Sequence, residues 1–343
     1  MSLTSSKLRP ILLTGALVLL LAGLAAAREA LVRPAPMIEE IDGSALMAPT
    51  TTLAASVPEA AALKAKITTP APEATAREME IRAPEPEAAA QNYRRRGRPR
   101  TPPRYPDPDA PIDSSFIFAR VQYTSVRDEP FGTGWTTDYP RGDLNFMRRF
   151  EEFTTSPISW DGSYPNHVVV TLYDEELFKY PFIFRSDVGT LGLDSVEVER
   201  LREYLLRGGF LWVDDFWGWR AWDQWQTEIG RVLPPDQYPI LDVPVDHPIR
   251  QMLYPIDEIP QIPSIQWFRR SGGYTTSERG SESATPHLRS ISGENGRIMV
   301  LMSHNTDIAD GWERENEDFD FFSRFSFPAY AVGINVVVYA RSH

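Results

Sequence analysis

From residue 112 to the C-terminus, short apolar runs alternate with segments of helical spacing. Runs without charge, such as HVVVTL, are typical of strands buried on both faces of a sheet. Apolar runs predict strands at 116–123, 167–172, 182–185, 210–214 and 297–303. Helical spacing predicts helices at 143–153, 194–207, 219–232 and 330–341. This alternation predicts an α/β domain with a mainly parallel sheet over residues 112–343.

Two of these helices carry signals at their ends. Asp143 fits the N-cap of the first, and Asp194 or Ser195 fits the N-cap of the second, because short oxygen-bearing side chains bond free N–H groups there. Gly208 then suits the left-handed position that ends the second helix. After residue 232 the pattern loosens. Three segments still fit strands and two fit loops: strands at 238–243, 265–268 and 287–291, an exposed loop at 271–285 and an acidic loop at 304–318.

Residues 208–225 join a helix end, a buried strand and a new helix, and they read GGFLWVDDFWGWRAWDQW. The paired carboxylates of Asp214 and Asp215 come where the strand should stop. Trp217 lies in the turn beside them, where an aromatic ring next to acids also suits a sugar-binding cleft. Three further tryptophans share one helical face and predict core packing: Trp219, Trp222 and Trp225.

Ligands of open α/β sheets bind beyond the carboxyl ends of the strands. Three polar clusters follow predicted strands in this chain, and Asp310 lies a little beyond the third. Together they make up the candidate pocket: Asp138, Tyr139 and Asn145; Asp214, Asp215 and Trp217; and His304, Asn305 and Asp307.

If these strand ends are neighbours, several carboxylates and one imidazole suit a divalent metal or general acid and base chemistry. The metal-ligand candidates are then Asp214, Asp215 and His304. In the alternative interpretation one of the paired aspartates caps the following helix, the other binds loop N–H groups, and His304 makes a structural hydrogen bond. No G-x-G-x-x-G or P-loop is present, so no cofactor is expected beyond the divalent metal that the first interpretation allows.

Composition limits the partners. The chain has a formal net charge of −12, and residues 111–343 hold 35 acidic against 21 basic side chains. Such a domain repels polyanions, so nucleic acid is not an expected partner. The absence of cysteine excludes disulfides, thiolate metal sites and a cysteine nucleophile.

The first 111 residues have a different character. Lys7 and Arg9 precede an uncharged apolar run at 11–27, so residues 1–27 fit a secretory signal peptide or a retained membrane anchor. Residues 28–111 contain fourteen prolines and few aromatic residues, which predicts a disordered linker. The linker includes an arginine cluster at 93–104 that fits a basic tether or an electrostatic contact with anionic envelope material. Both interpretations of residues 1–27 predict export, to the periplasm or to an anchored position in the inner membrane.

Four segments carry a resemblance: WTTDYPRGDLNF, LREYLLRGGFLWVDDFWG, DHPI at 246–249 and SHNTDIADGWE. They resemble a bacterial family of domains of unknown function, whose members look similar to the class I glutamine amidotransferase-like, or flavodoxin-like, fold. The resemblance implies a three-layer α/β/α sandwich. Active amidotransferases of that fold carry a cysteine nucleophile at a sharp strand-to-helix turn, and the lack of cysteine here excludes that activity.

Two functions are therefore considered. The first is a non-catalytic binding or interaction module of the cell envelope, which would bind an envelope component or a partner protein and reach the membrane through an uncleaved N-terminal segment. The second is a metal-dependent or carboxylate-dependent hydrolase of carbohydrate or cell-wall material, built on Asp138, Asp214, Asp215 and His304.

Overall fold

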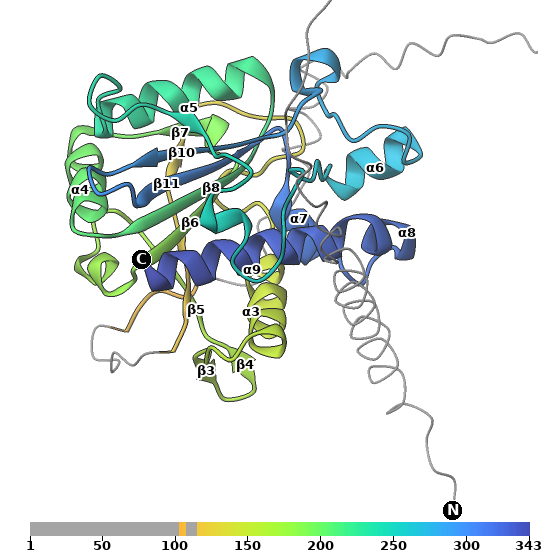
Figure 1. The fold of residues 1–343 in the computed structure, drawn as a ribbon, viewed down its shortest axis with the longest axis horizontal. Coiled ribbons are helices and arrows are strands. Elements are labelled where there is room, and N and C mark those ends of the chain that lie inside the picture. The colour runs from red at the N-terminus through yellow and green to blue at the C-terminus, as the bar shows by residue number, and fades with distance from the viewer. Residues whose placement is uncertain (1–102, 108–114) are drawn as a thin grey trace, which may run out of the picture. The chain divides into compact units, whose positions relative to one another are not determined.

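Seven strands form one sheet in the order β5-β1-β6-β8-β11-β10-β9 (Figure 1). The computed structural model describes residues 103–107 and 115–343. The predicted signal or anchor at 1–27 and most of the predicted linker at 28–111 therefore lie outside the described residues. The strands of this sheet are β1 (Phe118–Val121), β5 (His167–Val170), β6 (Phe182–Ser186), β8 (Phe210–Phe216), β9 (Leu241–Asp242), β10 (His287–Ser292) and β11 (Ile298–His304).

Five neighbouring strands, from β5 to β11, run parallel to one another. Strand β10 is antiparallel to β11, and the short edge strand β9 is antiparallel to β10. The prediction of an α/β domain with a mainly parallel sheet is confirmed. Two small antiparallel ladders lie apart from this sheet: β2 (Thr124–Ser125) with β7 (Leu191–Gly192), and β3 (Trp160–Asp161) with β4 (Tyr164–Pro165).

Helices pack on both faces of the large sheet (Figure 1). One face carries α4 (Ser195–Leu206) and α5 (Gly218–Val232), and the other carries α3 (Arg141–Phe153), α7 (Ile308–Glu313) and α9 (Phe327–Ser342). The short helices α6 (Ile265–Ser271) and α8 (Phe319–Phe321) lie at one end of the domain (Figure 1).

The core on the α3 side is largely aromatic. Trp312 of α7 lies between Phe146 of α3 and Trp212 of β8, with ring centroids 4.5 and 5.5 Å apart. All three rings are fully buried, so they join the helix layer to the centre of the sheet. This packing places the N-terminus of α7 against the carboxyl end of β8.

Helix α4 begins and ends as predicted. The Asp194 carboxylate accepts from the N–H groups of Val196 and Glu197, and the Glu197 side chain accepts from the Asp194 N–H, which forms a capping box. Gly208 follows the helix with φ of 106°, a backbone conformation that glycine adopts without strain.

Two segments predicted otherwise are helical. Residues 265–268 form the start of α6 rather than a strand, because Ser264 caps the helix by accepting from the Trp267 N–H and because Ile265 and Phe268 bury one helical face. The predicted acidic loop at 304–318 contains α7, whose cap is Asp307. In both segments a serine or aspartate cap starts a helix too short for a clear helical repeat.

The tryptophan stripe of α5 is only partly core. Trp225 is fully buried and Trp222 is half-buried, whereas Trp219 is 56% exposed. Trp219 stands in the first turn of α5.

One apolar stretch among the described residues, Phe319–Ser342, has the length and hydropathy of a membrane span. It is 67% buried within the domain, and α9 packs against α3, α7 and β6, as the core helix of a soluble domain does. The predicted closing helix at 330–341 is confirmed as the main part of α9.

Asp143 is not an N-cap. Helix α3 begins at Arg141, and Asp143 lies in its first turn, where it accepts from the Arg120 guanidinium at 3.0 Å (Nε to Oδ2) and 2.5 Å (Nη2 to Oδ1). Both side chains have no exposed surface, so this ion pair fixes α3 to strand β1 inside the protein.

Replacing Asp143 with alanine should therefore destabilise the domain by about 3–5 kcal/mol, because it leaves a buried arginine without its partner. Loss of an ordinary N-cap would cost about 1 kcal/mol. Urea unfolding measures the difference. The control is Asp161→Ala, which breaks the exposed Arg104–Asp161 pair and should cost at most about 1 kcal/mol. Equal effects of the two substitutions would contradict the assignment.

Candidate functional site

Buried carboxylates gather where the parallel strands end. Each of them is 7% exposed or less, and they come from the loop after β1, the turn after β6, the end of β8, the segment before η4 (Gly280–Ser283) and the start of α7. We call these eight residues the acidic cluster: Glu129, Asp138, Asp187, Asp214, Asp215, Glu278, Asp307 and Asp310.

The backbone is strained at the same place. Asp138, Asp187, Asp215 and Asn305 have φ values of 65°, 54°, 56° and 62°, in the left-handed region. Aspartate and asparagine tolerate this region better than other residues with a side chain, yet it remains uncommon. Asp187, Asp215 and Asn305 lie at or just beyond a strand end, whereas Asp138 lies in the loop shortly before α3. The strained turns thus set the direction in which the polar side chains leave the sheet.

The two adjacent aspartates of β8 have separate partners. Asp214 Oδ2 accepts from the Ala309 N–H in the first turn of α7 at 2.9 Å, and Asp215 Oδ1 accepts from the Trp217 indole N–H at 2.9 Å. Helix α5 has Trp217 at its N-cap, without a side-chain cap. The interpretation that one aspartate caps the next helix is therefore wrong. Asp214 does bind a backbone N–H, but that group belongs to helix α7 and not, as the sequence predicts, to a loop.

Three aspartates of the cluster bring their oxygens together. One carboxylate oxygen each of Asp138, Asp307 and Asp310 lies within 4.8 Å of the other two. Asp307 also accepts from the Asp310 N–H at 2.9 Å, and Asp138 accepts from the Ser186 hydroxyl at 3.3 Å. This is the group of described residues that could hold a metal ion.

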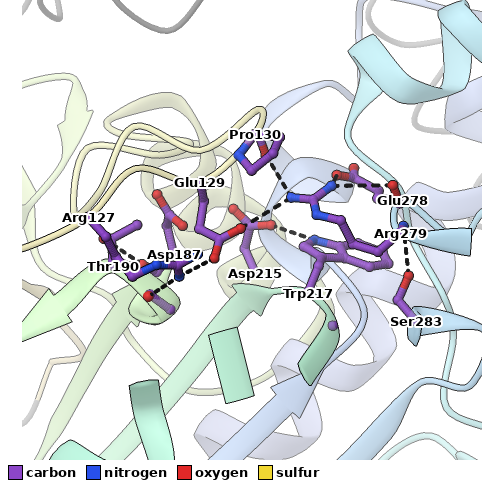
Figure 2. Close-up of polar contacts among 12 residues, drawn as sticks. Arg127, Glu129, Pro130, Asp187, Thr190, Asp215, Trp217, Glu278, Arg279 and Ser283 are labelled. Carbon is purple, nitrogen blue, oxygen red and sulfur yellow. Dashed lines mark hydrogen bonds and ion pairs between the residues drawn. The ribbon is translucent and has the colours of Figure 1, made fainter. Parts of the chain in front are cut away.

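Arg279 ties two loops together over the other end of the cluster (Figure 2). Its guanidinium lies 3.4 Å from Glu129 and 3.2 Å from Glu278, and it donates to the Pro130 carbonyl at 3.0 Å. Residues from two distant parts of the chain thus meet above Asp187 and Asp215.

Basic side chains do not balance the cluster. Glu129, Glu278 and Asp310 form ion pairs with arginines. Among the residues that the structure describes, the other five have no ion pair with arginine or lysine: Asp138, Asp187, Asp214, Asp215 and Asp307.

Burial raises the pKa of Asp138, Asp187, Asp215 and Asp307 well above the usual range, and the neighbouring carboxylates raise it further. Burial also raises the pKa of Asp214 to about 7, although the hydrogen bond from the Ala309 N–H opposes this shift. These groups keep protons at a pH where exposed aspartates have lost them, unless a cation replaces the protons.

His304 takes no part in this group. Its Nε2 lies 3.2 Å from the Gly218 carbonyl, and its ring packs against Phe216 and Trp222 with centroids 4.9 and 5.0 Å away. Burial, together with the nearby Arg289, lowers the pKa of His304 to about 3. The imidazole is thus neutral and turned toward the backbone, in keeping with the interpretation of His304 as a structural hydrogen-bonding residue.

Three further pocket candidates make structural contacts. The Tyr139 hydroxyl lies 3.3 Å from His167 Nε2, and the Asn145 amide donates to the Trp312 carbonyl at 2.9 Å. Asn305 accepts from the Gly218 N–H at 2.9 Å and donates to the Thr285 carbonyl at 2.8 Å. These side chains hold α3, α5 and α7 in place around the acidic cluster.

Four members of the acidic cluster are not among the residues that the sequence predicts for the pocket. Asp187 directly follows β6, so the expectation that ligands bind beyond the carboxyl ends of strands could have identified it. Asp310 was noted only as lying beyond the third cluster. Glu129 and Glu278 come from irregular loops, where neither spacing nor periodicity marks them.

The raised pKa values predict an unusual dependence of stability on pH. Protons held by the folded state stabilise it fully below the unfolded pKa of about 4, and this stabilisation is lost as the pH rises through the folded pKa of about 7 for Asp214. Between pH 5 and 8, with a chelator present, the wild type should therefore lose more unfolding free energy than Asp214→Asn, which cannot titrate. Histidines titrate in the same way in both proteins, so their contribution cancels in the difference between the two unfolding free energies. Parallel curves from urea unfolding would contradict this prediction.

Comparison with known proteins identifies the family. No curated protein matches the chain. The family described as Domain of unknown function (DUF4159) matches residues 117–340, a span that contains the whole sheet and every carboxylate of the acidic cluster. The chain belongs to this family.

Proposed function

We propose that this protein is an exported cell-envelope protein whose α/β domain is a non-catalytic binding module, with the acidic cluster as its binding site. The domain would be held on the N-terminal linker, either after signal cleavage or by a retained anchor in the inner membrane. The finer fold in this proposal is the three-layer amidotransferase-like sandwich, which the helices on both faces of the parallel sheet support.

The conformation of Asp215 is the observation on which this proposal rests. It lies at the end of the central strand β8 with φ of 56°, at the kind of sharp strand-to-helix turn where amidotransferases of the resembled fold carry their nucleophile. Here the side chain is a carboxylate that is 7% exposed and accepts from the Trp217 indole. The turn has the strained geometry, but its carboxylate is buried and already bonded to the indole, which supports a structural or binding role over attack on a substrate.

The second candidate function is the hydrolase, and the convergence of Asp138, Asp307 and Asp310 favours it. A catalytic metal needs an open coordination position for water or substrate. These three aspartates are 6%, 2% and 2% exposed, and His304 points toward Gly218 rather than toward them. Enclosure of the carboxylates therefore does not favour hydrolysis, and it fits a small bound ion better than a large partner, which would contact the exposed residues around the cluster.

The partner would be an envelope component or a partner protein. The acidic surface of the domain disfavours nucleic acid. Trp219, in the first turn of the helix that follows Asp215, carries an exposed ring. Aromatic rings of this kind can pack against sugar rings, so cell-wall glycan is the first partner to test.

The full chain should co-sediment with purified cell-wall sacculi and release no soluble fragments. Trp219→Ala should weaken the binding by about threefold to tenfold, the equivalent of the 0.5–1.5 kcal/mol of one aromatic contact. The matched control is Phe319→Ala, which removes a ring that is 80% exposed on α8. Release of fragments that Asp215→Asn abolishes would establish the hydrolase instead.

The proposed location has its own test, which is mass spectrometry of the mature protein from the bacterial envelope fraction. A start at Arg28 would show signal cleavage, and a start at Met1 or Ser2 in the membrane fraction would show a retained anchor. Recovery of the uncleaved chain from the soluble cytoplasm would contradict export.

A further inference from the structure

The strongest unexplained feature of the acidic cluster is the meeting of three aspartates from two separate segments. Asp138 comes from the loop after β1, and Asp307 and Asp310 come from the start of α7. One oxygen of each lies within 4.8 Å of the others, and all three side chains are buried. Three negative charges this close in a protein interior repel one another strongly unless a proton or a cation lies among them.

The arginines nearby do not supply that cation. Arg314 pairs with Asp310 at 3.2 Å, but it also bonds Glu317 and Glu313. Arg120 is held by Asp143 and donates to the Thr137 carbonyl at 2.8 Å. Asp138 and Asp307 have no ion pair with any described residue, so a proton or a bound cation, rather than an arginine, must stabilise these two carboxylates.

Asp214 provides a second and independent observation. This residue is fully buried, and its Oδ1 has no hydrogen-bond partner among the described residues. The Ser303 hydroxyl donates to the Val213 carbonyl and accepts from the Trp212 indole, so it leaves this oxygen unpaired. The other oxygen, Oδ2, accepts from the Ala309 N–H, between Asp307 and Asp310 in the chain. An unpaired buried carboxylate oxygen is costly unless a positive partner satisfies it. The hydrogen bond from Ala309 brings the Asp214 carboxylate to the first turn of α7, which carries Asp310 and has Asp307 as its N-cap.

We propose that Asp138, Asp307 and Asp310 bind one divalent cation, with Ca²⁺ preferred, and that Asp214 completes the site directly or through a bound water. The inference rests on the proposed function in taking this cluster as the binding site, and it names the ligand.

The donor set and its burial support Ca²⁺. All the available atoms are carboxylate oxygens, which suit Ca²⁺, Mg²⁺ and Mn²⁺. Ca²⁺ accepts about six to eight oxygens in a flexible geometry, whereas Mg²⁺ needs a near-ideal octahedron and gives up its bound waters reluctantly. Because the three carboxylates are buried, a cation that exchanges its waters for protein oxygens is favoured, and this supports Ca²⁺ over Mg²⁺.

The test is calorimetric titration of the full chain, freed of metal by chelation, with Ca²⁺, Mg²⁺ and Mn²⁺ separately, together with melting temperatures at millimolar cation. One Ca²⁺ should bind per chain and raise the melting temperature, because a ligand that binds only the folded state stabilises it. Asp138→Asn and Asp307→Asn should each weaken Ca²⁺ binding at least tenfold. Asp318→Asn is the matched control, since Asp318 also caps a helix but lies outside the cluster, and it should bind Ca²⁺ like the wild type.

Absence of binding and of a melting shift with all three cations would overturn the inference, as would unchanged affinity in both cluster variants. Binding of Mg²⁺ or Mn²⁺ but not Ca²⁺ would overturn the preference for Ca²⁺. If the variants do not fold, Tb³⁺ luminescence of the wild type, excited through tryptophan and competed by Ca²⁺, keeps the inference testable. A chain that binds Ca²⁺ and also degrades sacculi contradicts only the non-catalytic function, whereas one that binds sacculi without cleavage and takes no cation contradicts only the cation site.

Discussion

The structure depends on how negative charge is held at the carboxyl ends of its parallel strands. Eight carboxylates are buried there, and arginines pair with three of them. Charge in a low-dielectric interior is tolerated only when hydrogen bonds, counter-charges, protons or bound cations stabilise it. Two of the carboxylates are stabilised by hydrogen bonds: the Ala309 N–H of α7 donates to Asp214, and the Trp217 indole donates to Asp215. A counter-charge stabilises two others, because Arg279 pairs with both Glu129 and Glu278.

The same requirement explains how distant segments are arranged. The aromatic core around Trp312 fixes α7 so that its first turn faces the end of β8. The buried pair of Arg120 and Asp143 fixes α3 to β1, and α3 begins directly after the loop that carries Asp138. Packing on one face of the sheet therefore sets the positions of Asp138 and Asp307. The site is rigid because its supports are core residues rather than loop contacts alone.

Much of the architecture could be predicted from the sequence because buried parallel strands are uninterrupted apolar runs and helix ends carry chemical signals. Asp194 is an example, because the capping box needs only Asp194 and Glu197, which are three residues apart in the sequence. Short helices escaped prediction: α6 has seven residues and α7 has six, too few for a helical repeat to appear. Asp143 was misread because an aspartate near a helix start looks like a cap, and only the fold shows that Arg120 comes from a neighbouring strand. The position of the site at the strand ends could be predicted from the α/β topology. The full set of its residues could not, because Glu129 and Glu278 lie in irregular loops that meet through ion pairs with Arg279.

The central claim is that the acidic cluster is a closed binding site for positive charge rather than a catalytic centre. A crystal structure of the protein grown with Mn²⁺, with anomalous scattering recorded at the manganese edge, tests it most directly. The account predicts one anomalous peak among the oxygens of Asp138, Asp307 and Asp310, without a channel from the ion to solvent. A peak held by His304, or an ion with an open coordination position in a cleft, would contradict it.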